Sequence, residues 1–154
     1  PNRPLFGLDW SQSSQKILRL LKEQHGLNVV GRNFNMLEPD STFALRPRSG
    51  VFTVGAMEQL GGQFHKFVNY LLNQGPSVCV HVETLYDLYD QQQLFDYVAA
   101  KYLEKRNYLR GLLDTLRILE REGRIQILAI LRTFGSLYHD GYSLVIWKPV
   151  EENR

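Results

Sequence analysis

The feature that most constrains this chain is a leucine-lined stretch between Asn107 and Glu122, which a β-rich run follows almost at once. Its leucines fall at the spacing that places them on one face of an α-helix: Leu109, Leu112, Leu113, Leu116 and Leu119. Gly123 is a typical helix stop, and the run 125–131 is apolar and rich in isoleucine. A helix with one apolar face must be covered there, so this stretch predicts a folded core.

Shorter patterns precede this stretch and predict a mixed helix and strand chain. A helix is expected from about Asp9 to Gln24, with Gly26 as its stop, and short strands are expected at 28–30 and 42–45. The apolar positions from Met57 to Leu72 have helical spacing, interrupted by Gly61-Gly62. Two consecutive glycines inside a helix are unfavourable, which predicts that a neighbouring element approaches closely there.

The second half continues this alternation of helices and strands. We expect a strand at 78–82, a short helix at 84–90, a helical stretch at 91–104 and a return strand at 142–147. In the stretch 91–104, the residues predicted to face inward are Leu94, Phe95, Val98 and Tyr102.

The order from Met57 onward is helix, strand, helical segment, long helix and two-stranded hairpin, which resembles the winged helix-turn-helix superfamily over residues 51–150. The segment 112–125, which runs Leu-Leu-Asp-Thr-Leu-Arg-Ile-Leu-Glu-Arg-Glu-Gly-Arg-Ile, is similar to the third helix of that superfamily and its turn into the wing. The hairpin end at 144–149 is also weakly similar to ESCRT-II winged helices. The resemblance implies an α+β fold: a three-helix core and β-hairpin wing at 51–154, preceded by a helix and short-strand extension at 1–50.

Basic residues gather near the predicted third helix. Arg110, Arg117 and Arg121 share the face opposite the leucines, and Lys105, Arg106 and Asn107 precede it. The resemblance implies that this face enters the DNA major groove. Arg46 and Arg48, in a turn that ends at Gly50, are further candidates for phosphate contacts, and a charged loop is the more usual explanation for them. An acidic residue on the same face, Asp114, equally fits a solvated helix in which it pairs with Arg110 and Arg117.

A protein-binding role is the alternative to nucleic-acid binding. The net charge of +2 is small for a protein that holds nucleic acid by electrostatics alone. Tyr142 and Trp147 on the hairpin are aromatic candidates for a protein interface, as in a scaffold subunit of a multiprotein complex. Homodimerisation through the N-terminal helix or the wing is a third alternative.

Recognisable catalytic motifs are missing from the sequence, which favours a binding module over an enzyme. His81-Val82-Glu83 has the His-x-Glu spacing of zinc deaminases, but the Pro-Cys-x-x-Cys partner is missing and Cys79 is the only cysteine. No phosphate-binding glycine loop occurs, so neither a cofactor nor a metal is expected. A single cysteine and the lack of a long apolar run predict an intracellular protein of the nucleus or cytoplasm without a membrane span.

Overall fold

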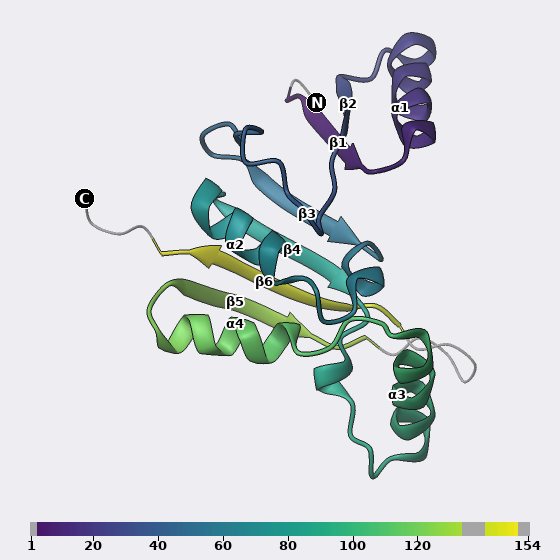
Figure 1. Ribbon diagram of the computed structural model, residues 1–154, viewed down its shortest axis with the longest axis vertical. Coiled ribbons are helices and arrows are strands. Elements are labelled where there is room, and N and C mark those ends of the chain that lie inside the picture. The colour runs from purple at the N-terminus through teal and green to yellow at the C-terminus, as the bar shows by residue number, and fades with distance from the viewer. Residues whose placement is uncertain (1–2, 134–140, 151–154) are drawn as a thin grey trace. The chain divides into compact units, whose positions relative to one another are not determined.

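The computed structural model describes residues 3–133 and 141–150 (Figure 1). The chain forms two compact units, Pro1–Thr42 and Phe43–Arg154, which are described separately below as unit 1 and unit 2. The domain boundary expected at Gly50 lies further along the chain than the junction of these units.

Unit 1 is a single β-α-β element. Strand β1 (Leu5–Asp9) pairs in parallel with β2 (Val29–Asn33), and α1 (Gln12–His25) connects them. Ser11 caps this helix by accepting a hydrogen bond from the Ser13 amide, and Gly26 ends it in a left-handed conformation. The expected helix and its stop are therefore confirmed, and the strand β1 precedes the helix.

Unit 2 is built on a four-stranded mixed sheet. Strands β3 (Gly50–Val54), β4 (Val78–Glu83), β5 (Ile125–Leu131) and β6 (Ser143–Pro149) lie in the order β3-β4-β6-β5. The pair β3 and β4 is parallel, and β6 runs antiparallel to both β4 and β5. The sheet thus has a parallel part, whose strands need helical crossovers, and a C-terminal hairpin inserted beside it.

Helices and short 3-10 turns connect these strands. Turn η1 (Met57–Leu60) and helix α2 (His65–Gln74) lead from β3 to β4, and turn η2 (Tyr86–Leu88) with helices α3 (Leu94–Arg106) and α4 (Leu112–Arg121) leads from β4 to β5. Figure 1 shows α2 and α4 on the same side of the sheet. The predicted leucines of α4 form the core against this side together with Trp147, and all of them are buried.

The helix predicted at Met57–Leu72 is divided at its glycine pair. Gly61 has a φ of +59°, and a Cβ there would lie 2.9 Å from the carbonyl oxygen of Asn107. This contact confirms the predicted close approach for Gly61. Gly62 has open space around it, so only the first glycine is required by the fold.

The opposite side of the sheet is apolar and partly open. Because side chains alternate along a strand, the register assigns the following residues to this side: Phe52, Val54, Val78, Val80, Val82, Ala129, Leu131, Leu144 and Ile146. None of them is fully buried, and Phe52 is 69% exposed. Gln126 and Lys148 are its polar members and pair with each other near one end. We call this surface the open sheet face.

The winged-helix topology predicted for residues 51–154 is wrong. The two strands expected to form an isolated wing are part of the four-stranded sheet, in which β6 also pairs with β4. No strand forms at 42–45. The four residues expected to face inward on α3 are all exposed, from 54% for Tyr102 to 72% for Leu94. Helical spacing predicted these helices, but it does not specify which strands pair or which face is covered.

Candidate functional site

A row of buried polar side chains crosses the parallel part of the sheet. Thr53 on β3 lies opposite His81 on β4, and Glu83 ends β4. All three point to the side that α2 and α4 cover, and His81 and Glu83 are completely buried. Burial of polar groups is unfavourable unless they are hydrogen-bonded, so this row has to be satisfied internally.

Glu83 holds the loop that follows β3. Its Oε1 accepts a hydrogen bond from the amide of Ala56 at 3.2 Å, and its Oε2 accepts one from the amide of Glu58 at 3.1 Å. The Thr53 hydroxyl is a further polar neighbour of this carboxylate and favours its charged form. Burial raises the pKa of Glu83, while these hydrogen bonds oppose that rise. The carboxylate thus fixes the first turn of the loop 55–60 at the carboxyl end of β3.

His81 continues the row into the core. Its Nδ1 lies 2.9 Å from the Thr53 hydroxyl oxygen, and its ring lies 6.1 Å from the Trp147 ring between centroids. Burial lowers the pKa of His81 to about 4, so the ring is neutral at physiological pH. Within the part of the chain that the structure describes, Nε2 of His81 and Nε1 of Trp147 have no hydrogen-bond partner.

The loop 55–60 is enclosed by two further segments of unit 2. The Glu58 carbonyl accepts a hydrogen bond from the amide of Leu109 at 2.9 Å. Tyr142, just before β6, lies so close to Gly55 that a Cβ there would be 2.7 Å from its hydroxyl. The negative charge of Glu58 is the main reason why the pKa of Tyr142 is raised. The result is a well-supported loop at the strand ends, where ligands bind in open α/β sheets.

A second strand end with a polar side chain lies in unit 1. Asp9 ends β1, and its Oδ1 accepts a hydrogen bond from the amide of Ser11 at 2.6 Å. Within the described ranges 3–133 and 141–150, no hydrogen bond to its second oxygen, Oδ2, is found. This oxygen is available to accept a hydroxyl donor.

The basic residues predicted to bind nucleic acid fall into separate groups. Lys105 and Arg106 end α3, Asn107 caps it in a left-handed conformation, and Arg110 donates a hydrogen bond to the Asn107 side chain at 3.2 Å. Arg110 precedes α4 instead of lying on it. Arg46 and Arg48 lie in the loop before β3, where Arg48 has a φ of +63°.

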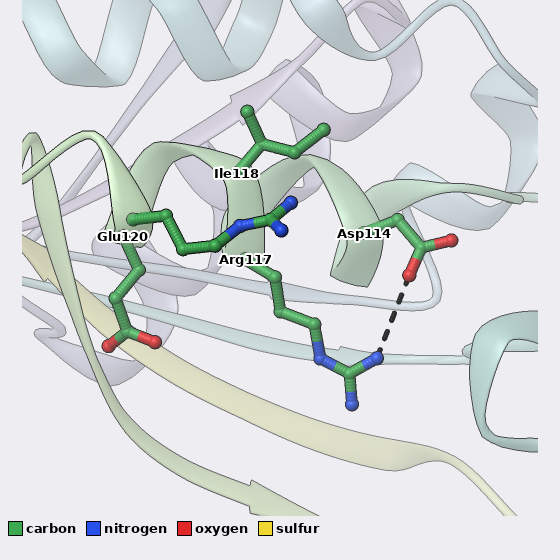
Figure 2. Close-up of a pocket in the computed structure, with 5 residues that line it drawn as sticks. Asp114, Arg117, Ile118 and Glu120 are labelled. Carbon is green, nitrogen blue, oxygen red and sulfur yellow. Dashed lines mark ion pairs between the residues drawn. The ribbon is translucent and has the colours of Figure 1, made fainter.

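Arg117 and Arg121 are exposed on α4. They line a shallow surface depression with Asp114, Ile118 and Glu120, all from this one helix. Figure 2 shows Arg117 extended toward Asp114, and the two form a loose ion pair at 3.6 Å. This pairing agrees with the solvated-face alternative for these residues. A hollow formed by one helix encloses too little of a ligand to serve as a binding pocket.

The two hairpin aromatics have different environments. Tyr142 is 39% exposed, and its role at a protein interface stays a prediction. Trp147 is completely buried in unit 2, so its side chain cannot reach a partner there. Cys79 is also fully buried, and burial raises its pKa to about 12.

Sequence reasoning missed the buried row and Asp9. The available signal was the occurrence of Thr53, His81 and Glu83 inside otherwise apolar strands, because a polar residue in such a strand has to find a partner. The His-x-Glu pair was considered only as a metal motif. In the residues that the structure describes, no group of three or more His, Cys, Asp or Glu side chains is arranged to hold a metal ion.

The comparisons with known proteins concern the fold alone. The sequence matches no protein-family model and no curated protein. The structure is similar to the crystal structure of the small RNA methyltransferase HEN1, with a TM-score of 0.60, 12% identity, and coverage of 96% of this chain and 20% of that chain. It is also similar to a variant of LepI in complex with SAH and a substrate analogue, with a TM-score of 0.51, 10% identity, and coverage of 97% and 44%. The LepI complex with SAM gives the same values.

These similarities overturn the winged-helix interpretation and what followed from it. The chain has a methyltransferase-like fold, and it spans less than half the length of the solved structures that it matches. The non-enzymatic DNA-binding or scaffold module was inferred from the winged-helix resemblance, and that inference is wrong. The named structures include a methyltransferase and a protein described as a pericyclic reaction enzyme.

Among the described helices, none has the length and apolar character needed to cross a membrane.

Proposed function

We propose that this chain forms part of a SAM-binding, methyltransferase-like enzyme domain. The observation that carries the proposal is the similarity of almost the whole chain to folds solved with SAM or SAH. The parallel pairs β1-β2 and β3-β4 support it, because open α/β sheets bind nucleotides at the carboxyl ends of such strands. An intracellular location is part of the proposal, since a single buried cysteine fits a reducing compartment.

Asp9 is the residue of unit 1 that fits such a cofactor. An acidic side chain after a strand accepts hydrogen bonds from ribose hydroxyls in nucleotide-binding α/β folds. The Asp9 carboxylate is fixed through Oδ1 by Ser11 and retains Oδ2 for a hydroxyl donor. We therefore assign Asp9 to the ribose of SAM. When bound, SAM supplies an electrophilic methyl group.

The loop 55–60 is the part of unit 2 that we assign to the active site. It follows a parallel strand, and the contacts with Glu83 and Leu109 fix its backbone. A rigid loop of this kind can position a substrate accurately, because little entropy is lost when the substrate binds. The acceptor of the methyl group is not part of the proposal.

The open sheet face supports the proposal in a different way. Parallel sheets are normally covered on both faces, and their strands are apolar throughout for that reason. Here α2 and α4 lie on one side of the sheet, and the open sheet face has the same apolar composition. We infer that a helical layer covers this face in the working domain, as in doubly wound folds.

Calorimetric titration of the protein with SAH tests the assignment. We expect the wild type to bind SAH, and we expect Asp9→Asn to weaken binding by about tenfold to a hundredfold, the effect of losing a hydrogen bond to a charged group. Asp40→Asn is the matched control, because Asp40 is an exposed acid of the same unit that hydrogen-bonds its neighbour Thr42. A wild type that binds neither SAH nor SAM contradicts the proposal, and equal affinities of the two variants contradict the role of Asp9.

A further inference from the structure

The side chains of the buried row carry few polar hydrogens, and the number of these hydrogens limits how the hydrogen bonds of the row can be directed. Thr53 has one hydroxyl hydrogen and has two neighbours in the row, the His81 Nδ1 and the Glu83 carboxylate. An ionised carboxylate can only accept hydrogen bonds. If Glu83 is ionised, Thr53 therefore donates to Glu83 and accepts from His81, which requires a hydrogen on Nδ1.

The reverse direction is unfavourable for two reasons. It either withdraws the Thr53 hydrogen from an ionised Glu83, or requires a protonated Glu83 that donates to Thr53, which removes the charge from the acceptor of the Ala56 and Glu58 amides. It also moves the hydrogen of His81 to Nε2, which has no partner in the described structure. A buried N–H without an acceptor is rare in proteins, and a buried donor left unpaired is strongly unfavourable.

We infer that His81, Thr53 and Glu83 form a one-directional hydrogen-bond chain that positions the loop 55–60, with His81 fixed as its Nδ1–H tautomer. His81 donates to Thr53, Thr53 donates to Glu83, and Glu83 accepts the loop amides. Thr53 and His81 are thus positioning residues that act on the loop through Glu83. The inference does not depend on which ligand the loop binds.

The groups around Glu83 are consistent with its role as the final acceptor of the hydrogen-bond chain. The charges of Glu58, on η1, and of Glu83 both raise the pKa of Tyr142, which precedes β6. No cation contributes to the environment of Glu83 within the described residues. The positive ends of the loop amide dipoles, together with the Thr53 hydroxyl, are what stabilise its charge.

NMR measurement of the ¹⁵N chemical shifts of the His81 ring nitrogens tests the inference directly. We expect the His81 signals, identified by their loss in His81→Asn, to show the Nδ1–H tautomer in the wild type at neutral pH. Thr53→Ser retains the hydroxyl and should retain this tautomer. Thr53→Val removes the hydroxyl with little change in shape and should abolish the preference. A role of Thr53 in packing alone would not change the tautomer.

Amide hydrogen exchange gives a second readout on the loop. In Thr53→Val we expect exchange at the Ala56 and Glu58 amides to accelerate about tenfold or more, because Glu83 loses one donor and holds the loop less firmly. Thr115→Val is the matched control, since Thr115 hydrogen-bonds the Gly111 carbonyl at the start of α4. Equal exchange in both variants overturns the inference. An Nε2–H tautomer in the wild type also overturns it, even if Thr53→Val does not fold.

Discussion

At the scale of single residues, the neutral state of His81 links the stability of unit 2 to pH. The pKa of His81 in the folded protein is lowered from 6.5 to about 4 by burial. Between these values the unfolded chain binds a proton that the folded chain does not, so the free energy of unfolding falls as the pH is lowered from 6.5 toward 4. The full loss associated with His81 is about 3 kcal/mol. Urea denaturation at several pH values measures it.

The contribution of His81 can be separated from that of Glu83 by comparing variants. The raised pKa of Glu83 acts in the opposite direction, because its folded form takes up a proton first as the pH falls. His81→Gln leaves Glu83 in place, so the difference between variant and wild type isolates the histidine. We expect a flatter pH dependence for His81→Gln. His65→Gln, at an exposed position, should follow the wild type, and a parallel curve for His81→Gln would contradict the prediction.

Arg132 is the second residue for which we expect a measurable effect. Its guanidinium forms two hydrogen bonds of 2.6 Å to the Asp96 carboxylate and lies 4.8 Å from the centre of the Tyr89 ring. These hydrogen bonds hold the pKa of Asp96 below its ordinary value. Lysine cannot form the bidentate pair of hydrogen bonds, so Arg132→Lys should lower the free energy of unfolding by about 1–2 kcal/mol.

Arg124→Lys provides the control for that prediction. Arg124 forms an ion pair with Glu122 at 3.7 Å, and both side chains are about half exposed, so the same change should alter stability by less than about 0.5 kcal/mol. Both values can be measured by urea denaturation at neutral pH. Equal effects of the two substitutions would show that the bidentate geometry at Arg132 adds no more to the free energy of unfolding than an exposed ion pair does.

At the scale of elements, the break between η1 and α2 depends on one glycine. Gly61 combines a φ of +59° with a close approach to the Asn107 carbonyl, whereas Gly62 has neither feature. We expect Gly61→Ala to lower the free energy of unfolding by about 1–3 kcal/mol, because the added Cβ is strained in this conformation and meets backbone. Gly62→Ala should be neutral. Thermal unfolding of the two variants compares adjacent positions, and equal midpoints would exclude this explanation of the break.

The sequence predicted elements better than it predicted their faces. The leucines of α4 are buried as expected, because strict helical spacing on a charged background specifies both the helix and its inner side. On α3 the apolar residues occur around the whole helix, so the side chosen as inward, that of Leu94 and Val98, was not determined by the pattern and is exposed. The divided helix at Gly61 was missed because the contact with Asn107 is distant in sequence.

At the scale of the whole molecule, strand pairing was the information that the sequence did not contain. The hairpin of β5 and β6 was expected, but the pairing of β6 with β4 and of β4 with β3 joins segments separated by up to about seventy residues. Such pairings depend on the crossovers that bring the strands together, not on local pattern. The candidate site lies at the ends of these strands, and so Glu83 and Thr53 could not be recognised as partners.

The open sheet face leads to a prediction about the assembled domain. If the chain works within a doubly wound fold, helices cover this face, and a cysteine placed there reacts slowly with a thiol reagent in the native protein. Phe52 is 69% exposed in the described structure, so a covering layer is needed to protect a thiol there. In the assembled domain we expect Phe52→Cys to be protected at least about tenfold relative to the urea-unfolded protein, because a buried thiol is inaccessible and resists ionisation. Ile118→Cys, on the exposed side of α4, should react at nearly the unfolded rate.

Cys79 is completely buried and does not interfere in the native state. Rapid reaction of both variants would show that the face is exposed to solvent, which would contradict a covering helical layer while leaving the SAH titration as a separate test of cofactor binding.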